Sequence, residues 1–170
     1  MLTESMAVTP PTLYAAFGSK EELYREALAR YRHLGRQAAA VSTESGSVFS
    51  MLEHHLRAAA QRFPDPDKPK GCMVAVGSLQ CGADNRNAAD AVASERRAGL
   101  AGFVIQLEQA KQRGELPCDT DADALACFYA AVYQGMSIQA IDGADTARLN
   151  ALVDIALAAW PGRRPDGGRA

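Results

Sequence analysis

The stretch that most constrains this chain is residues 8–24, where a short helix, a tight turn and a longer helix are predicted to follow one another. Thr9 stands directly before Pro10. A threonine hydroxyl can cap the free amides at a helix start, and proline in the first helical position loses no hydrogen bond. Gly18 predicts the end of the short helix, because glycine readily adopts the conformation that closes one.

The residues after this glycine predict a second helix start. Ser19 and Glu22 have the S-x-x-E spacing of a capping box, in which each side chain satisfies a free amide of the new helix. Leu13 and Phe17, four residues apart, share one face of the short helix. Such a helix between two turns, with polar side chains on its exposed side, suits insertion into the DNA major groove.

In order, these residues read Val-Thr-Pro-Pro-Thr-Leu-Tyr-x-x-Phe-x-Ser-Lys-Glu-x-Leu-Tyr. This pattern resembles the recognition helix, turn and following helix of the tetracycline-repressor (TetR-like) family of transcriptional regulators. The resemblance implies a cytoplasmic, ligand-responsive regulator, a repressor, that binds a double-stranded DNA operator as a homodimer. Carried over position by position, the DNA contacts are Thr9, Pro10, Pro11, Thr12 and Tyr14, with Lys20 on a phosphate. The family's usual histidine, two residues after the tyrosine, is Ala16 here.

The start of the chain departs from the family pattern. TetR-like proteins have a helix before the helix-turn-helix, whereas residues 1–7 match only the second half of the next helix. Ala7 stands where the family usually has the glycine of the turn. The chain therefore resembles an N-terminally truncated member. The alternative is a helical ligand-binding or dimerisation protein that has lost DNA binding because the first helix is missing.

Composition favours a soluble globular protein, since 48% of the 170 residues are hydrophobic and 22% are charged. No apolar run approaches the roughly 20 residues that span a membrane, and no export signal is visible, so we expect a cytoplasmic protein without membrane contact. The net charge of −2 does not itself indicate a nucleic-acid partner. Helix N-termini can nevertheless bind phosphate through their free amides.

Apolar residues at helical spacing predict about seven helices and no strand. After the longer helix, at about 19–37, helices are expected at 48–63, 87–113, 119–140 and 145–160, with an exposed connection at 64–71. Residues 72–81 fit a buried strand or a buried helix by period, and their helical neighbours favour the helix. The fold class is all-α, with a partial helix-turn-helix module and connecting helix in 1–36. A helical ligand-binding and dimerisation core in 37–160 and a disordered tail in 161–170 complete the predicted organisation.

The core supplies candidates for an effector pocket and a dimer interface. A cavity among its helices would be lined by Leu56, Met73, Val76, Gln80, Phe103, Leu107, Phe128, Tyr129 and Tyr133, unless these side chains simply fill the core. The absence of a buried charge cluster predicts a small hydrophobic effector. The last two helices resemble the family's four-helix dimer interface, and Gly135 in mid-helix would allow close approach.

No pattern in the chain predicts catalysis, a cofactor or a metal. The sequence lacks a G-x-S-x-G elbow, a glycine-rich phosphate loop and an H-E-x-x-H motif, so we expect no enzyme. His54 and His55 are adjacent, cannot share one helix face as ligands, and are expected to be solvated. Cys72, Cys81, Cys118 and Cys127 are expected to be small buried apolar residues, a thiol-sensing role for one of them being the alternative.

Overall fold

A computed structural model describes residues 2–40, 46–77 and 86–162 of the chain. Within these ranges there are eight α-helices and no strand, which confirms the all-α prediction. The helices are α1 (Leu2–Ser5), α2 (Pro10–Phe17), α3 (Lys20–Ala40), α4 (Val48–Arg62), α5 (Met73–Val76), α6 (Arg86–Gln112), α7 (Ala122–Ile141) and α8 (Thr146–Ala158).

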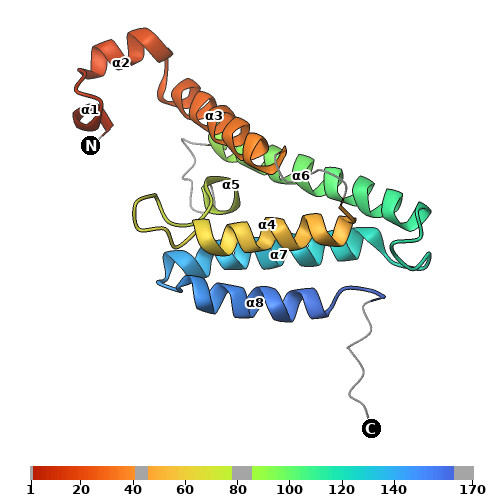
Figure 1. Cartoon of the computed structure of the whole chain (residues 1–170). Coiled ribbons are helices and arrows are strands. Elements are labelled where there is room, and N and C mark those ends of the chain that lie inside the picture. Colours follow the sequence, from red (N-terminus) through yellow and green to blue (C-terminus); the bar gives the residue numbers. More distant parts are fainter. Residues whose placement is uncertain (1, 41–45, 78–85, 163–170) are drawn as a thin grey trace.

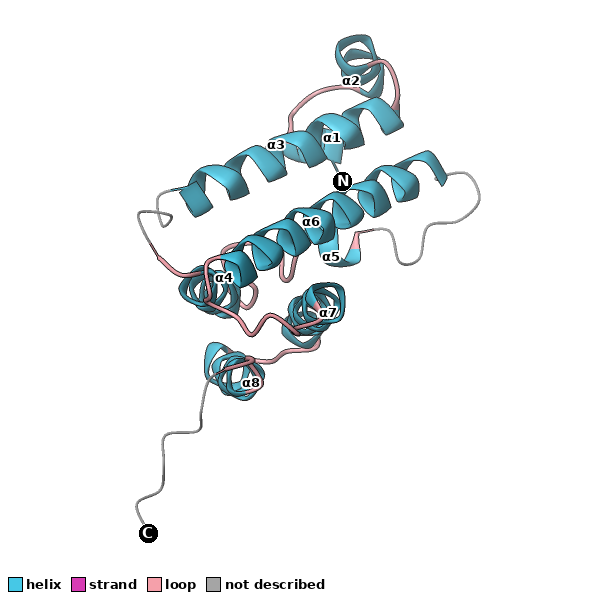
Figure 2. Ribbon diagram, turned by 90° about the vertical axis from the view of Figure 1, so that its right-hand side faces the viewer, coloured by secondary structure: helices cyan, strands magenta, loops and turns pink. Residues whose placement is uncertain are grey.

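The helices lie in layers. α4 and α7 lie alongside each other with α8 next to them, and α6 crosses their other side (Figure 1). α3 lies over α6, so the order of layers is α3, α6, the α4–α7 pair and α8 (Figure 2). α1 and α2 project from the far end of α3, away from the layered helices. We call residues 2–40 the reading head and residues 46–162 the core.

Polar side chains set the helix starts in the core. The hydroxyl of Ser47 accepts a hydrogen bond from the amide of Ser50 (3.2 Å) at the start of α4. The carboxylates of Asp121 and Asp145 do the same for α7 and α8, at 2.9 and 2.8 Å. These are N-caps, each of which stabilises a helix by about 1 kcal/mol. Gly114 lies just past the end of α6 with φ at +73°, a conformation that glycine readily adopts where a helix closes.

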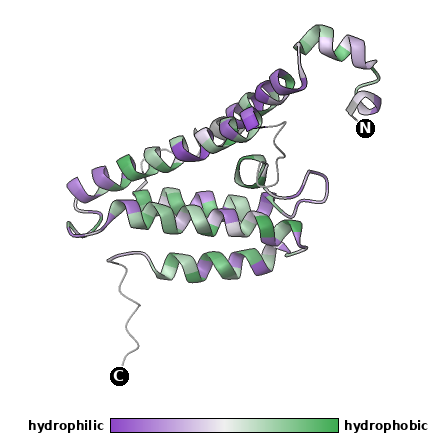
Figure 3. Ribbon diagram, turned by 180° about the vertical axis from the view of Figure 1, so that it is seen from behind, coloured by the Kyte–Doolittle hydropathy of each residue, from purple (hydrophilic) through white to green (hydrophobic). Residues whose placement is uncertain are grey.

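The hydrophobic core is built mainly from α4, α6, α7 and α8. Its largest fully buried side chains include Tyr129, Phe63, Leu56, Leu107 and Met136. Seen from behind, α4, α7 and α8 carry more hydrophobic residues than the overlapping pair of α3 and α6 (Figure 3). Packing in the core therefore holds the four helices together, while α3 is a mostly polar arm.

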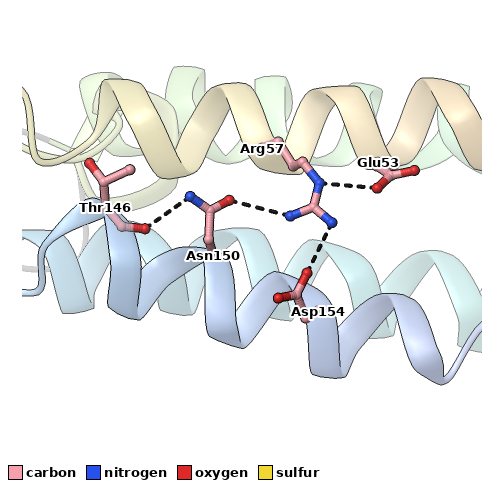
Figure 4. A network of polar contacts seen from close by, with 5 residues as sticks. All are labelled: Glu53, Arg57, Thr146, Asn150 and Asp154. Carbon is pink, nitrogen blue, oxygen red and sulfur yellow. Dashed lines mark hydrogen bonds and ion pairs between the residues drawn. The ribbon is translucent and has the colours of Figure 1, made fainter.

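One polar network also joins α4 to α8 (Figure 4). The guanidinium of Arg57 donates to Glu53 (3.0 Å), to Asp154 (2.9 Å) and to Asn150 (3.4 Å). The amide of Asn150 in turn donates to the carbonyl of Thr146 (3.0 Å). Within this drawn group, Arg57 is the α4 residue that makes the contacts to α8.

The segment predicted as one buried helix, residues 72–81, is shorter than expected. α5 is only four residues long, and it ends before Gly77. Cys72 and Ala75 are buried, but Met73, Val74 and Val76 are half-buried, and residues 78–81 lie outside the described residues. Proline and glycine fix the exposed connection before it, as predicted, and Gly71 at its end has φ of +79°.

α7 is the one helix in the described residues that is long and apolar enough to cross a membrane by length and composition. It packs against α4, α5, α6 and α8, as a core helix does. Only 28% of its most apolar window is buried within one chain. Leu125, Val132 and Tyr133 pack partly against the core, whereas Phe128, Ile138 and Ile141 are exposed and mark an uncovered face of α7.

Candidate nucleic-acid interface and effector region

The short helix α2 begins as the sequence predicts. The hydroxyl of Thr9 accepts a hydrogen bond from the amide of Thr12 (3.4 Å) and pairs with the Thr12 hydroxyl (2.9 Å). Pro10 and Pro11 occupy the first helical positions, where neither removes a needed hydrogen bond. Leu13 is buried, whereas Tyr14 is 46% exposed. α2 therefore turns one apolar residue inward and presents its polar side to solvent.

The turn after α2 matches the prediction in part. Gly18 has φ of +75°, and its amide closes α2 on the carbonyl of Tyr14 (2.8 Å). The amide of Glu22 donates to the hydroxyl of Ser19 (3.1 Å), which is one half of the predicted capping box. In place of the other half, the amide of Ser19 donates to the carbonyl of Phe17 (2.9 Å). The Glu22 carboxylate lies over Gly18, so close that an added Cβ there would meet it at 2.3 Å.

The side chains predicted to contact DNA are brought together on one exposed end of the molecule. Thr9, Pro10, Pro11, Thr12, Tyr14 and Lys20 are all exposed. Lys20 is the first residue of α3, directly after the turn. The nearby Glu21 carboxylate forms an ion pair with Arg25 (2.7 Å) and accepts a hydrogen bond from the Asn87 side chain (3.0 Å). The head thus offers a lysine, three hydroxyls and a helix start, a combination suited to a phosphate backbone.

The residues predicted to line a ligand cavity divide between several environments. Leu56, Leu107 and Tyr129 are buried in the core; Met73, Val76, Phe103 and Tyr133 are half-buried; Phe128 is exposed; Gln80 lies outside the described residues. The half-buried group comes from α5, α6 and α7, which pack against one another. The hydroxyl of Tyr129 already donates to the carbonyl of Ala156 (3.0 Å). A shallow hollow on the described surface lies elsewhere, between Pro117, Thr120, Phe128 and Pro161.

Beside the half-buried group lies a polar cluster that sequence spacing did not reveal, formed by Tyr31, Arg62, Cys72 and Tyr133. The hydroxyls of Tyr31 and Tyr133 point at the Cys72 sulfur, at 3.4 and 3.8 Å. Arg62 donates to the Tyr133 hydroxyl at 2.9 Å. Burial, and then the Cys72 thiol, raise the pKa of Tyr31 to about 12. Burial likewise raises the pKa of Tyr133, so both phenols stay protonated donors at neutral pH.

The histidines and cysteines fall partly where they were expected. His54 and His55 are both exposed, as predicted, but the His55 ring also stacks on Tyr133 at 4.9 Å. Burial of part of that ring lowers the pKa of His55. Cys72 is buried, as expected. The same expectation is wrong for Cys118 and Cys127, which are exposed; the first lies in a loop and the second on the uncovered face of α7. Cys81 lies outside the described residues, among which no metal-binding group occurs.

Comparison with known proteins shows which class of protein has this arrangement. Residues 49–154 match the tetracyclin repressor-like C-terminal domain. The HTH-type transcriptional repressor ComR of Escherichia coli (strain K12) is 33% identical over 162 residues, which are 94% of this chain and 77% of ComR. The repressor BdcR of the same organism is 35% identical over 79 residues, 45% of this chain and 39% of BdcR.

Solved structures agree with these relatives. A cysteine variant of the TetR family transcriptional regulator CifR, complexed with 26-base-pair operator DNA, is 40% identical with a TM-score of 0.87, over 94% of this chain and 84% of CifR. A putative TetR regulator from Rhodococcus sp. RHA1 has a TM-score of 0.67 at 29% identity, over 94% and 86% of the two chains. The fold and the helix-turn-helix thus define a one-component transcriptional regulator. The chain belongs to the TetR family.

Proposed function

We propose that this chain represses transcription by binding a double-stranded DNA operator as a homodimer, and that a small hydrophobic effector releases it. The observation that supports this most is the α2–turn–α3 unit at one end of the molecule, in which Thr9, Thr12, Tyr14 and Lys20 are all exposed. Relatives with matching folds include a regulator whose structure contains operator DNA. Selection of bound sequences from a random duplex library tests the proposal. Failure to enrich any sequence would favour the alternative of a helical ligand-binding or dimerisation protein.

Within that proposal, α2 reads base edges and the start of α3 binds the backbone. Pro10 and Pro11 stiffen the first turn, so Thr9 and Thr12 are presented in a fixed arrangement. A fixed arrangement lowers the entropic cost of binding. Replacing Thr12 by Val keeps its shape but removes its hydroxyl. The change should weaken binding to the selected operator more than binding to random DNA, which is a loss of about 1–3 kcal/mol of discrimination.

The dimer is proposed to form through the uncovered faces of α7 and α8. Large apolar side chains are exposed there: Phe128 (43%), Ile138 (42%), Ile141 (46%) and Ile155 (76%). A Cβ built on Gly135 would meet no atom within 4 Å, so this position of α7 leaves room for a second helix. Phe128, Gly135 and Ile138 fall on one side of α7. A two-fold interface buries such a surface in both copies at once.

Sedimentation equilibrium of Ile155→Asp tests this interface. A charge at the centre of a buried apolar contact should convert the dimer to a monomer at micromolar concentration. Ile105→Asp is the matched control, because Ile105 is also exposed (58%) but lies on α6. A wild-type chain that is monomeric at that concentration, or two variants with the same mass, would refute the assignment.

The effector is proposed to bind beside α5, among Met73, Val76, Phe103 and Tyr133. These side chains are half-buried, so a ligand can reach them and still gain apolar contact. The Tyr133 hydroxyl donates to Cys72 and accepts from Arg62, so its second lone pair is what can accept a hydrogen bond from the effector and orient it. A thermal-shift screen should find neutral, apolar compounds that raise the melting temperature of wild type, and raise it less for Val76→Ala. Stabilisation by charged hydrophilic compounds only would show that the predicted effector class is wrong.

A further inference from the structure

The two arginines of α4 have opposite surroundings. Arg57 donates to the carboxylates of Glu53 and Asp154 (Figure 4). Arg62, the last residue of α4, makes no ion pair with any described residue. Its one hydrogen bond within the described part of the chain goes to the Tyr133 hydroxyl, at 2.9 Å. Because a guanidinium has five N–H donors, most of those on Arg62 remain available.

The neighbours of Arg62 are neutral aromatic rings. The ring of Phe63 lies 5.3 Å from the guanidinium carbon. The Tyr133 ring lies between those of Phe63 and His55, at 5.1 and 4.9 Å. Burial raises the pKa of Tyr133, and burial, followed by the charge of Arg62, lowers the pKa of His55. At neutral pH these rings are therefore uncharged, and none of them balances the positive charge of Arg62.

The Tyr133 hydroxyl brings a hydrogen-bond acceptor next to these donors. Its proton points at the Cys72 sulfur (3.8 Å), and one of its lone pairs accepts from Arg62. One lone pair is left over. Tyr133 also belongs to the half-buried residues beside α5, with Met73 and Val76. Unused donors and an unused acceptor thus lie side by side at the edge of an apolar surface.

This pair of groups restricts what can cover that surface. A purely apolar ligand would exclude water from Arg62 and Tyr133 without replacing its hydrogen bonds, which is costly. A protonated amine would bring a second positive charge to Arg62. A carboxylate would accept from Arg62 but would direct its own lone pairs at the lone pair of Tyr133. A neutral hydroxyl or primary amide satisfies both, because its oxygen accepts from Arg62 and its proton goes to Tyr133.

We infer that Arg62 and Tyr133 form the polar end of the effector site and bind a neutral hydroxyl or primary amide at one end of an apolar ligand. This inference rests on the proposed function, because it specifies the chemistry of the effector proposed to bind beside α5. Arg62 donates to the oxygen of that group, and Tyr133 accepts from its O–H or N–H. The apolar body of the ligand then contacts Met73, Val76 and Phe103, which are half-buried.

The test compares two probes of similar shape, benzyl alcohol and ethylbenzene, which differ by a hydroxyl in place of a methyl group. Their dissociation constants are measured by NMR titration of the whole chain, for wild type and for Arg62→Met, which keeps an apolar stem but has no N–H donor. The ratio of the alcohol's dissociation constant to that of ethylbenzene should rise roughly tenfold in the variant, because a hydrogen bond to a charged group is lost. Tyr133→Phe, which removes the accepting oxygen, should raise the same ratio several-fold. General loosening of the site affects both probes and cancels in the ratio.

Arg57→Met is the matched control, since it removes an arginine of the same helix whose donors already pair with carboxylates. It should leave the ratio at its wild-type value. A ratio that is unchanged in both Arg62→Met and Tyr133→Phe would overturn the inference and leave the proposed hydrophobic effector site intact. Tighter binding of phenylacetate than of benzyl alcohol to wild type would also overturn it, because the preferred group would then be an anion. If neither probe shifts the amide signals of residues 73–77, the proposed effector site itself fails, and the inference fails with it.

Discussion

The reading head and the core differ in how their sequences encode them. Among the described side chains of residues 3–33, the buried ones are Leu13 and Leu28, and neither belongs to the main hydrophobic cluster. The core contains that whole cluster, from Val48 to Trp160. The head is specified by turns and caps within a few residues of each other. The core is specified by contacts between residues far apart in the chain.

Because of this difference, the head is the part that is easy to identify from sequence, and the core is the part that makes the fold stable. The head shows its residues on the surface in a fixed local order, so a short stretch of sequence is enough to identify it. Little of it is buried, however, so its local free energy of opening should be well below that of global unfolding. The core has the opposite properties: its packing supplies most of the free energy of folding, while many apolar sequences could fill it.

The largest expected effect comes from shortening a buried leucine in the core, compared with the same change in the head. Leu56 on α4 is 1% exposed and lies in the main cluster. Leu56→Ala should lower the free energy of unfolding by about 3 kcal/mol, since it loses apolar contact and leaves a cavity. Leu13→Ala, the matched change in the head, should barely shift the global transition. Urea denaturation followed by circular dichroism measures both, and equal losses would show that head and core unfold as one unit.

A second expected effect concerns strain in the head. Ala7 has φ of +51°, and among described residues it is the only one besides glycine with positive φ. That conformation costs an L-residue roughly 1–2 kcal/mol. Ala7→Gly should therefore stabilise the head by about 1 kcal/mol and slow hydrogen exchange in α2. Ala15→Gly, in the middle of α2, serves as the control, because glycine there should speed exchange. Faster exchange after Ala7→Gly would show that the turn is not strained in solution.

A third, smaller effect is expected where the core relies on charge. Arg57 joins α4 to α8 through Asn150 and Asp154. Its side chain is 39% exposed, so solvent screens these contacts and Arg57→Ala should cost only about 0.5–1 kcal/mol. Arg25→Ala is the counterpart in the head, where Arg25 pairs with Glu21 at 2.7 Å and is more exposed. It should cost a few tenths of a kcal/mol at most. Thermal denaturation at low and high salt distinguishes the two, and a larger loss for Arg25→Ala would contradict the comparison.

Sequence reasoning was most accurate where the cause of structure is local. Thr9 caps the start of α2 and Gly18 ends it through their own side-chain and backbone chemistry, and both stand where the pattern predicted. Residues 72–81 were predicted less well. An uncharged run has the same composition in a buried helix, a buried strand or a short turn of helix, and its length is set by the helices around it. The four-residue α5 was therefore not predictable from its own sequence.

The polar cluster around Cys72 shows why the candidate site was harder to predict than the fold. Tyr31 and Cys72 are 41 residues apart, and Tyr133 and Cys72 are 61 apart. Each tyrosine also fits an apolar helix stripe, so periodicity marks it as a core residue and conceals its hydroxyl. Phe128 and Cys127 are the reverse case. Both side chains are apolar, which predicts burial, but both are exposed in a single chain. In the proposed dimer, the surface that covers them belongs to the second copy of the chain.

The smallest expected effect tests the head at a single charge. Lys20 is exposed at the start of α3, where the proposed complex places a phosphate. Lys20→Ala should weaken binding to the selected operator and to random duplex by the same factor. It should also flatten the plot of log binding constant against log salt by ~0.9, because one fewer counterion is released. Lys70→Ala, an exposed change in the connection before α5, should leave the slope unaltered. Fluorescence anisotropy across a salt series measures both variants. A loss confined to the selected operator would instead assign Lys20 to base recognition, and the backbone contact would then have to come from the free amides at the start of α3.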